Sequence, residues 1–303
     1  MIRFRAFSKR FGNHLAVERL TLDVGRGDVV ALLGPNGSGK TTSLKAAAGL
    51  IRPTAGEVAV GDPPRPSVLA EARRITSYLP QRVSFPDTLS GLEVVEFYRA
   101  LRGAPGGRVQ DVMKAAALNG AGERAVGTYS GGMVQRLGLA VAMLPDAPVL
   151  LLDEPTAALD PDGLCTFYGL VERHRSDGRT VLFSSHQLGD VERLADRIAV
   201  LVEGRLVATF TASELALRLA DRGVMRLRVE RTSDAVLAGV RTIAPRATMV
   251  GSDLVVPGPA ADRPRVLAAL QATGATVLAL TAEEGRLDAF YHELIAEQEE
   301  RHP

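Results

Sequence analysis

The sequence predicts an α/β fold: a parallel sheet covered by helices, followed by a small α+β domain towards the carboxyl end. Continuous short apolar runs, as expected for strands buried on both faces, alternate with segments of helical spacing. A glycine-rich loop joins the first of these runs, 29–33, to a helical segment, which is how a βα unit begins. After about residue 222 shorter strands and helices follow with a different texture.

The composition is that of an ordinary globular protein. Of the 303 residues, 46% are hydrophobic and 23% are charged. The formal net charge is +1, so no global basic field indicates nucleic acid, and we expect no nucleic-acid partner. The single cysteine, Cys165, excludes an intrachain disulfide, and we expect it to be a small buried residue. We read His14 and His174 as surface residues, because neither has metal-ligand spacing.

A role in a membrane process would need a separate partner. No run of about 18 or more apolar residues occurs, and the first residues lack the apolar core of a signal peptide.

Two domains are expected, 1–221 and 222–303. In the first, buried strands at 29–33, 149–152, 180–184 and 197–202 alternate with helices near 162–175 and 187–195, which implies a parallel sheet. Residues of about 82–148 lack such strands and have helical spacing at 92–102 and 109–118, so we expect a helical subdomain there. In the second domain we expect strands at 225–229, 247–256 and 275–280, and helices at 234–243, 263–273 and 285–297.

The glycine-rich loop fits the pattern G-x-x-x-x-G-K-[ST] at every fixed position. It reads Gly34-Pro35-Asn36-Gly37-Ser38-Gly39-Lys40-Thr41, followed by Thr42. Backbone N–H groups of such a loop and the start of the next helix can surround a triphosphate. Lys40 would reach the β- and γ-phosphates, the Thr41 hydroxyl would bind Mg²⁺, and Thr42 would add a phosphate contact. A chance turn before a helix is the alternative. The strand before the loop and the helix after it favour a P-loop NTPase that binds ATP.

Two acids end the next buried strand. Val149–Leu152 is directly followed by Asp153 and Glu154. Ligands of parallel sheets bind at the carboxyl ends of the strands, so Asp153 is expected to hold Mg²⁺ and Glu154 to accept a proton from the attacking water. A plain strand end with solvated acids is the alternative, but two acids directly after four buried aliphatic residues would be costly without a cation.

The segment between these motifs resembles that of a known family. Tyr129-Ser130-Gly131-Gly132-Met133 is similar to the L-S-G-G-Q signature of ABC ATPases, with departures at its first and last positions. Within this resemblance, Gln81 corresponds to the Q-loop glutamine that touches Mg²⁺ or the attacking water, and Asp160 lies in the D-loop. His186 corresponds to the switch histidine, and Phe11 to the aromatic residue that stacks on adenine. Alone, Phe11 would more simply be a core residue and His186 a structural histidine.

The resemblance covers about residues 1–220 and implies a mechanism. Ser130, Gly131 and Gly132 would act across a dimer interface on ATP bound by a second copy. The chain would hydrolyse ATP for separate integral membrane permease subunits, and would lie at the cytoplasmic face of the inner or plasma membrane through them.

The carboxyl-terminal domain resembles the one appended to exporter-type ABC ATPases, including a closing helix with Leu287-Asp288-Ala289-Phe290-Tyr291. More narrowly, Thr41-Thr42-Ser43, Tyr78-Leu79-Pro80, 128–133 and 135–137 are similar to the copper-processing ATPase of nitrous oxide reductase maturation. Exporters of drugs, lipids or polysaccharides, and a soluble non-transport ABC ATPase, remain alternatives. So does a ligand-sensing role for residues 222–303.

Overall fold

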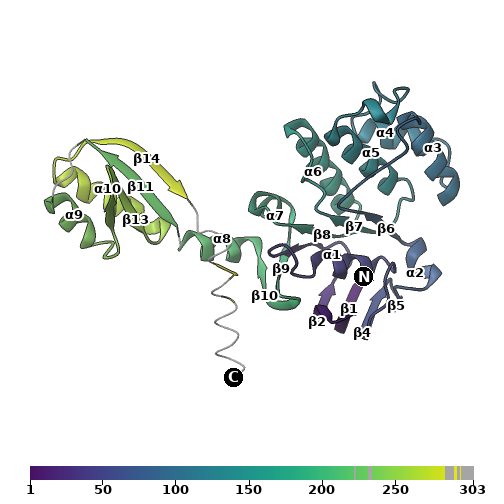
Figure 1. Ribbon diagram of the computed structural model, residues 1–303, viewed down its shortest axis with the longest axis horizontal. Helices are drawn as coiled ribbons and strands as arrows, with labels where there is room; N and C mark the ends of the chain where they lie inside the picture. Colours follow the sequence, from purple (N-terminus) through teal and green to yellow (C-terminus); the bar gives the residue numbers. More distant parts are fainter. Residues whose placement is uncertain (222, 231–233, 284–289, 292–293, 295–303) are drawn as a thin grey trace. The chain divides into compact units, whose positions relative to one another are not determined.

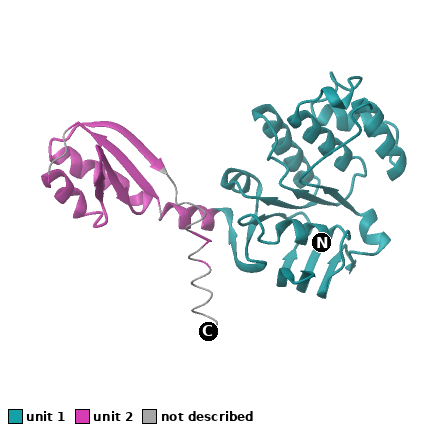
Figure 2. Ribbon diagram, in the orientation of Figure 1, with its two compact units in different colours: residues 1–212 teal, residues 213–303 magenta. Residues whose placement is uncertain are grey.

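The computed structural model describes residues 1–221, 223–230, 234–283, 290–291 and 294. They form two compact units, residues 1–212 and 213–303 (Figure 2). The sequence predicts the boundary between residues 221 and 222, nine residues later. The difference is helix α8 (Ala212–Ala220), which follows strand β10 (Arg205–Thr211) directly. No glycine or proline separates the two elements, so the sequence carries no break there.

A six-stranded sheet forms the centre of the first unit (Figure 1). In spatial order its strands are β10, β9 (Arg197–Val202), β3 (Val29–Leu33), β8 (Thr180–Ser185), β7 (Val149–Asp153) and β6 (Thr76–Leu79). All run parallel except β10, which pairs antiparallel with β9. Every residue of β3, β7 and β8 is buried, which is why these strands contain the unbroken apolar runs 29–33, 149–152 and 181–183.

Helices cover both faces of this sheet. Helix α1 (Lys40–Ala47) lies on one side and α6 (Pro161–Ser176) on the other (Figure 1). Two shorter helices, α2 (Ala70–Arg74) and α7 (Leu188–Leu194), lie beside strands β6 and β8 respectively. Among the described residues, no helix is long and apolar enough to cross a bilayer.

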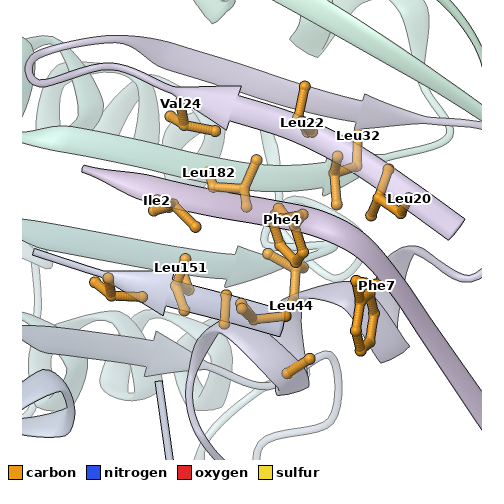
Figure 3. Packing of buried hydrophobic residues seen from close by; sticks show 14 of the residues in the cluster. Ile2, Phe4, Phe7, Leu20, Leu22, Val24, Leu32, Leu44, Leu151 and Leu182 are labelled. Carbon is orange, nitrogen blue, oxygen red and sulfur yellow. The ribbon is translucent and has the colours of Figure 1, made fainter. Parts of the chain in front are cut away.

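A second, antiparallel sheet packs against α1. Its order is β2 (His14–Val24), β1 (Ile2–Phe11), β4 (Ala55–Val60) and β5 (Arg65–Pro66). Phe4 and Phe7 of β1 are fully buried and pack with Leu44 of α1 and with Leu151 and Leu182 of the central sheet (Figure 3). Helix α1, which begins at Lys40, is therefore held between two sheets by apolar side chains.

A helical subdomain contains α3 (Gly91–Arg102), α4 (Arg108–Ala115), the 3₁₀ turn η1 (Val126–Thr128) and α5 (Gly131–Met143). Helix α3 begins with a capping box, in which Ser90 accepts from the N–H of Glu93 and Glu93 accepts from the N–H of Ser90. Val95, Val112 and Leu137 from the three α-helices share one buried core.

The second unit is a two-layer α+β structure. After α8, its elements are β11 (Val224–Val229), α9 (Asp234–Arg241), β12 (Thr248–Val250), β13 (Asp253–Pro257), η2 (Ala260–Asp262), α10 (Arg263–Ala272) and β14 (Val277–Glu283). The strands form an antiparallel sheet of order β12-β13-β11-β14, the βαββαβ arrangement of ferredoxin-like domains. Helices α9 and α10 pack on one face through Val240 and Leu270. The expected closing helix lies outside the described residues, except for Phe290, Tyr291 and Leu294, which are buried.

Two expectations about single residues were wrong, and both concern α6. Cys165 is exposed, because the buried face of this helix is formed by Gly163, Phe167, Leu170, Val171 and His174. His174 is therefore buried rather than at the surface.

Candidate active site

A cavity of about 430 Å³ lies in the first unit where the central strands end. Its described lining residues are Phe11, His14, Ala16, Asn36, Gly37, Ser38, Gly39, Lys40, Thr41, Thr42, Gln81, Glu154 and His186. Most of the residues predicted for the site therefore meet in one place, because parallel strands deliver their carboxyl ends to the same edge.

The loop 34–41 has the backbone geometry that its glycines imply. Gly34 has φ +157° and packs so closely on β9 that a Cβ atom there would lie 2.0 Å from the carbonyl oxygen of Leu201. Gly39, at φ 97°, is the N-cap of α1 and gives the helix no side-chain cap. The first N–H groups of α1 are thus available to an anion.

Ser38 and Lys40 also fit an anionic ligand. The Ser38 hydroxyl is buried, and no described residue forms a hydrogen bond with it. The Lys40 Nζ donates to the carbonyl oxygens of Gly34, at 2.7 Å, and Pro35, at 2.9 Å. Burial lowers the pKa of Lys40, and the charges of Glu154 and Asp153 act in the opposite direction. A cation in such surroundings is well placed to bind phosphate oxygens.

Asp153 is the buried centre of a group of hydroxyls. Its Oδ1 accepts from Thr41 Oγ1 at 3.0 Å and from Ser184 Oγ at 2.8 Å, and its Oδ2 accepts from the Tyr78 hydroxyl at 3.3 Å. Burial and the neighbouring Asp153 charge raise the pKa of Tyr78 well above its usual range. The carboxylate of Asp153 and the hydroxyl of Thr41 are oxygen donors of the kind that Mg²⁺ prefers.

These oxygens alone do not form a complete metal site. Among the described residues, no group of three or more His, Cys, Asp or Glu side chains is arranged to hold a metal ion. A cation here would have to complete its shell with substrate oxygens and water, as Mg²⁺ commonly does beside nucleotides.

Glu154 is held in place from three sides. Its N–H donates to Ser184 Oγ at 2.9 Å, and its Oε2 accepts from Gln81 Nε2 at 2.9 Å. The same Oε2 lies 3.5 Å from His186 Nδ1. Its backbone has φ 46°, in the left-handed region that non-glycine residues rarely adopt. A strained backbone fixed by its surroundings is common where a side chain must point in one direction.

The predicted residues of the signature and D-loop lie elsewhere. Ser130 is the N-cap of α5, where its hydroxyl accepts from the N–H of Met133 at 3.2 Å. Asp160 caps α6 by accepting from the N–H of Gly163 at 2.8 Å. Of the described residues that line the cavity, none comes from 130–132 or is Asp160.

Phe11 lies at the edge of the cavity. The residue is 49% exposed, and Lys9 Nζ is 5.0 Å from the ring centroid. This exposure separates Phe11 from the core phenylalanines of the same strand and leaves a ring face accessible.

Comparisons with known proteins agree with this geometry. Residues 17–157 match the family model for the ABC transporter. The chain is 34% identical over 279 residues to a daunorubicin resistance ATP-binding protein of Streptomyces coeruleorubidus, covering 88% of this chain and 86% of that protein. The chain belongs to the ABC transporter family. It is the ATP-binding motor subunit, an ABC ATPase.

Two further comparisons extend this ABC ATPase assignment. A doxorubicin resistance ATP-binding protein of Mycobacterium tuberculosis is 33% identical, with 84% of this chain and 80% of that protein covered. A solved dimeric ATP-binding cassette in a post-hydrolysis state, bound to ADP and Pi, has a TM-score of 0.64 and 27% identity. The match covers 70% of this chain and 99% of the cassette. ABC ATPases work as dimers with membrane permease partners, and that cassette is dimeric.

Sequence reasoning missed two lining residues of this ABC ATPase, His14 and Ala16. His14 is exposed, as expected, but it is the register partner of Phe11 in the β1–β2 hairpin. The two intervening residues, Gly12 and Asn13, are a recognised two-residue turn signal. That signal would have placed His14 opposite Phe11.

Proposed function

We propose that two copies of this chain bind two ATP molecules between them and hydrolyse both. The observation that carries this proposal is that the cavity holds the P-loop, Glu154 and His186 but none of residues 130–132. A second copy would supply Ser130, Gly131 and Gly132, and Asp160 would lie at the same interface. The N-terminus of α5, capped by Ser130, would then provide a second set of N–H donors to the phosphates.

Residues of one copy would have distinct tasks. Backbone groups of the loop would surround the phosphates, and these come from Gly34, Pro35, Asn36, Gly37, Ser38 and Gly39. Lys40 would neutralise the phosphate charge, and Thr42 would add a contact. Thr41, Gln81 and Asp153 would hold Mg²⁺. When bound, this cation supplies charge neutralisation at the phosphate oxygens. Phe11 stacks on the base.

Glu154 would act on the attacking water and His186 on the terminal phosphate. The Glu154 carboxylate takes a proton from it, while His186 orients the terminal phosphate. Gln81 holds the Glu154 carboxylate, so that it is directed before the reaction begins. Positioning and charge neutralisation supply most of the acceleration.

The decisive experiment measures ATPase activity of the purified chain against its concentration, beside Lys40→Ala. We expect specific activity to rise steeply with concentration in the wild-type chain and to vanish in the variant. Constant specific activity from a proven monomer would mean that one chain holds a complete site, and the composite-site proposal would then be abandoned.

We infer that the dimer drives a separate permease that exports a drug-like compound, from the cytoplasmic face of the membrane. The support is the names of the two relatives, which are resistance proteins for daunorubicin and doxorubicin. The narrower likeness to a copper-processing ATPase rests partly on Thr41 and Tyr78. Both bond to Asp153 in the candidate active site, so this likeness bears on ATP chemistry rather than on cargo.

Cells that express this chain together with its permease test the cargo. We expect lower accumulation of daunorubicin than in cells with the Lys40→Ala chain. Unchanged daunorubicin accumulation together with altered copper tolerance would favour the copper-processing alternative.

A further inference from the structure

A second buried carboxyl group lies next to the candidate active site but outside the lining of its cavity. Asp190, on α7, is 3% exposed. Its Oδ2 accepts from Thr156 Oγ1 at 2.6 Å and from Ser185 Oγ at 3.2 Å, and its Oδ1 accepts from the Tyr168 hydroxyl at 2.7 Å. Among the described residues, no lysine or arginine forms an ion pair with it. Three hydroxyl groups satisfy its polar atoms, and the single proton of the Ser185 hydroxyl is shared between Asp190 Oδ2 and the carbonyl oxygen of Gln187, each at 3.2 Å.

The three hydroxyls come from three segments that meet at the site. Thr156 lies two residues after Glu154, and Ser185 directly precedes His186. Tyr168 lies on α6, the helix that Asp160 caps. Asp190 thus joins the chain just beyond β7 to the end of β8, and those two places carry Glu154 and His186.

The contact at Ser185 also shapes the backbone around His186. Ser185 Oγ accepts from the N–H of Gln187 at 2.9 Å, which closes a turn across His186. The His186 side chain itself is 48% exposed. Its position relative to Glu154 therefore depends largely on how this turn is anchored.

The remaining contacts make the junction rigid. Burial, followed by the hydrogen bond to Asp190, raises the pKa of Tyr168 to about 12, so its hydroxyl remains a donor at neutral pH. The Arg193 guanidinium lies 4.6 Å from the centroid of the Tyr168 ring. Gln135 Nε2 of α5 donates to the carbonyl oxygen of Pro155, which directly precedes Thr156, at 3.2 Å. Buried networks in which each member is satisfied fix a single local geometry.

We propose that Asp190 is a positioning residue for ATP hydrolysis, which sets the place of His186 relative to Glu154 by binding Thr156 and Ser185. It does not line the cavity and would touch neither nucleotide nor water. This inference rests on the roles proposed above for Glu154 and His186.

Asp190→Asn tests the proposal with little change in shape. The carbonyl oxygen of the asparagine side chain can still accept, but its NH2 group only donates, so at least one of the three hydroxyls loses its acceptor. We expect kcat to fall by about 10- to 100-fold, since a displacement of about 1 Å can cost that much, while the Kd for ATP stays within about 2-fold. The control is Asp196→Asn. Asp196 Oδ2 accepts from the N–H of Val29 at 2.9 Å, at the ends of the strands away from the cavity.

A second pair of variants guards against misfolding. Thr156→Val removes one donor and Thr156→Ser keeps it, so kcat should fall in the first and be largely restored in the second. Thr76→Val, which removes a buried 2.8 Å bond to the carbonyl oxygen of Ala72, is the control for stability alone.

A double-mutant cycle with His186→Ala in single-turnover reactions decides between positioning and general structure. We expect Asp190→Asn to slow the His186→Ala chain much less than the wild type. Equal slowing in both backgrounds, or an ATP Kd that weakens in step with kcat, would overturn the proposal. Glu154→Gln in the same series separates this from failure of the proposed function, because that failure would leave Glu154→Gln as active as wild type.

Discussion

The side-chain amide of Gln81 donates a 2.9 Å hydrogen bond to Oε2 of Glu154. Gln81 follows β6 and Glu154 follows β7, and the two strands are parallel neighbours. The bond therefore joins two strand ends that deliver polar groups to the same cavity.

Glu154→Gln should bind ATP and lose turnover. The substitution keeps the shape of the side chain but removes the proton acceptor, and general bases contribute about 10²- to 10⁴-fold. We expect kcat to fall by at least about 100-fold at unchanged ATP affinity. Glu203→Gln is the control, because Glu203 is exposed and has a similar backbone φ of 48°. Near-normal turnover of Glu154→Gln would remove Glu154 from this role.

Phe11→Ala should weaken ATP binding. Stacking of a base on an aromatic ring contributes about 1–3 kcal/mol, which corresponds to about 5- to 150-fold in Kd. Phe11→Tyr should bind as the wild type does. Phe97→Ala is the control, because Phe97 is 61% exposed and lies outside the cavity lining. Equal ATP affinity of Phe11→Ala and wild type, measured by equilibrium titration, would contradict the stacking role.

Gly34→Ala should destabilise the first unit more than Gly37→Ala. Both glycines have positive φ, so each substitution costs about 1–3 kcal/mol of backbone strain. A Cβ at Gly34 would also lie 2.0 Å from the Leu201 oxygen, whereas nothing lies within 4 Å at Gly37. The clash adds about 1–3 kcal/mol or more. Denaturant unfolding measures the difference, and equal midpoints for the two variants would contradict the packing found here.

Stability should fall in mild acid because of His174. Burial, and then the charge of Arg179, lowers the pKa of this imidazole in the folded chain. Unfolded histidine titrates near about 6.5, so below that pH the unfolded chain binds more protons than the folded one. The contribution of His174 to the free energy of unfolding is then fully present above about pH 6.5. It is lost as pH falls towards the lower folded pKa. His174→Gln should flatten this part of the profile, and an unchanged slope in the variant would exclude His174 as its cause.

The central strands and the phosphate loop were predictable because their signals are local. Val149–Asp153 and Thr180–Ser185 are buried on both faces, so each strand contains consecutive apolar residues, 149–152 and 181–183. The positive φ of Gly34 and Gly39 is a local property of the loop, although a Cβ at Gly34 would also clash with Leu201 of β9. The common edge of the sheet then brings Glu154 and His186 together.

Other features depend on contacts between distant segments and could not be read in the same way. The burial of His174 follows from which face of α6 packs, and the helix carries apolar residues on more than one side. The bond from Thr156 to Asp190 joins residues 34 apart in the chain, at a place where no spacing motif marks either. In the sequence alone, a threonine and an aspartate in separate segments are indistinguishable from ordinary surface residues, because only the fold buries them together.

The separation of Ser130 from the cavity that contains Lys40 bears on genetics. In a proposed mixed dimer, one chain would carry Lys40→Ala and the other a substitution at Ser130. Both lesions would then fall in the same composite site, and the other site would be wild type at every position. Two inactive alleles could therefore complement one another in one cell, so loss-of-function phenotypes would depend on which alleles are paired.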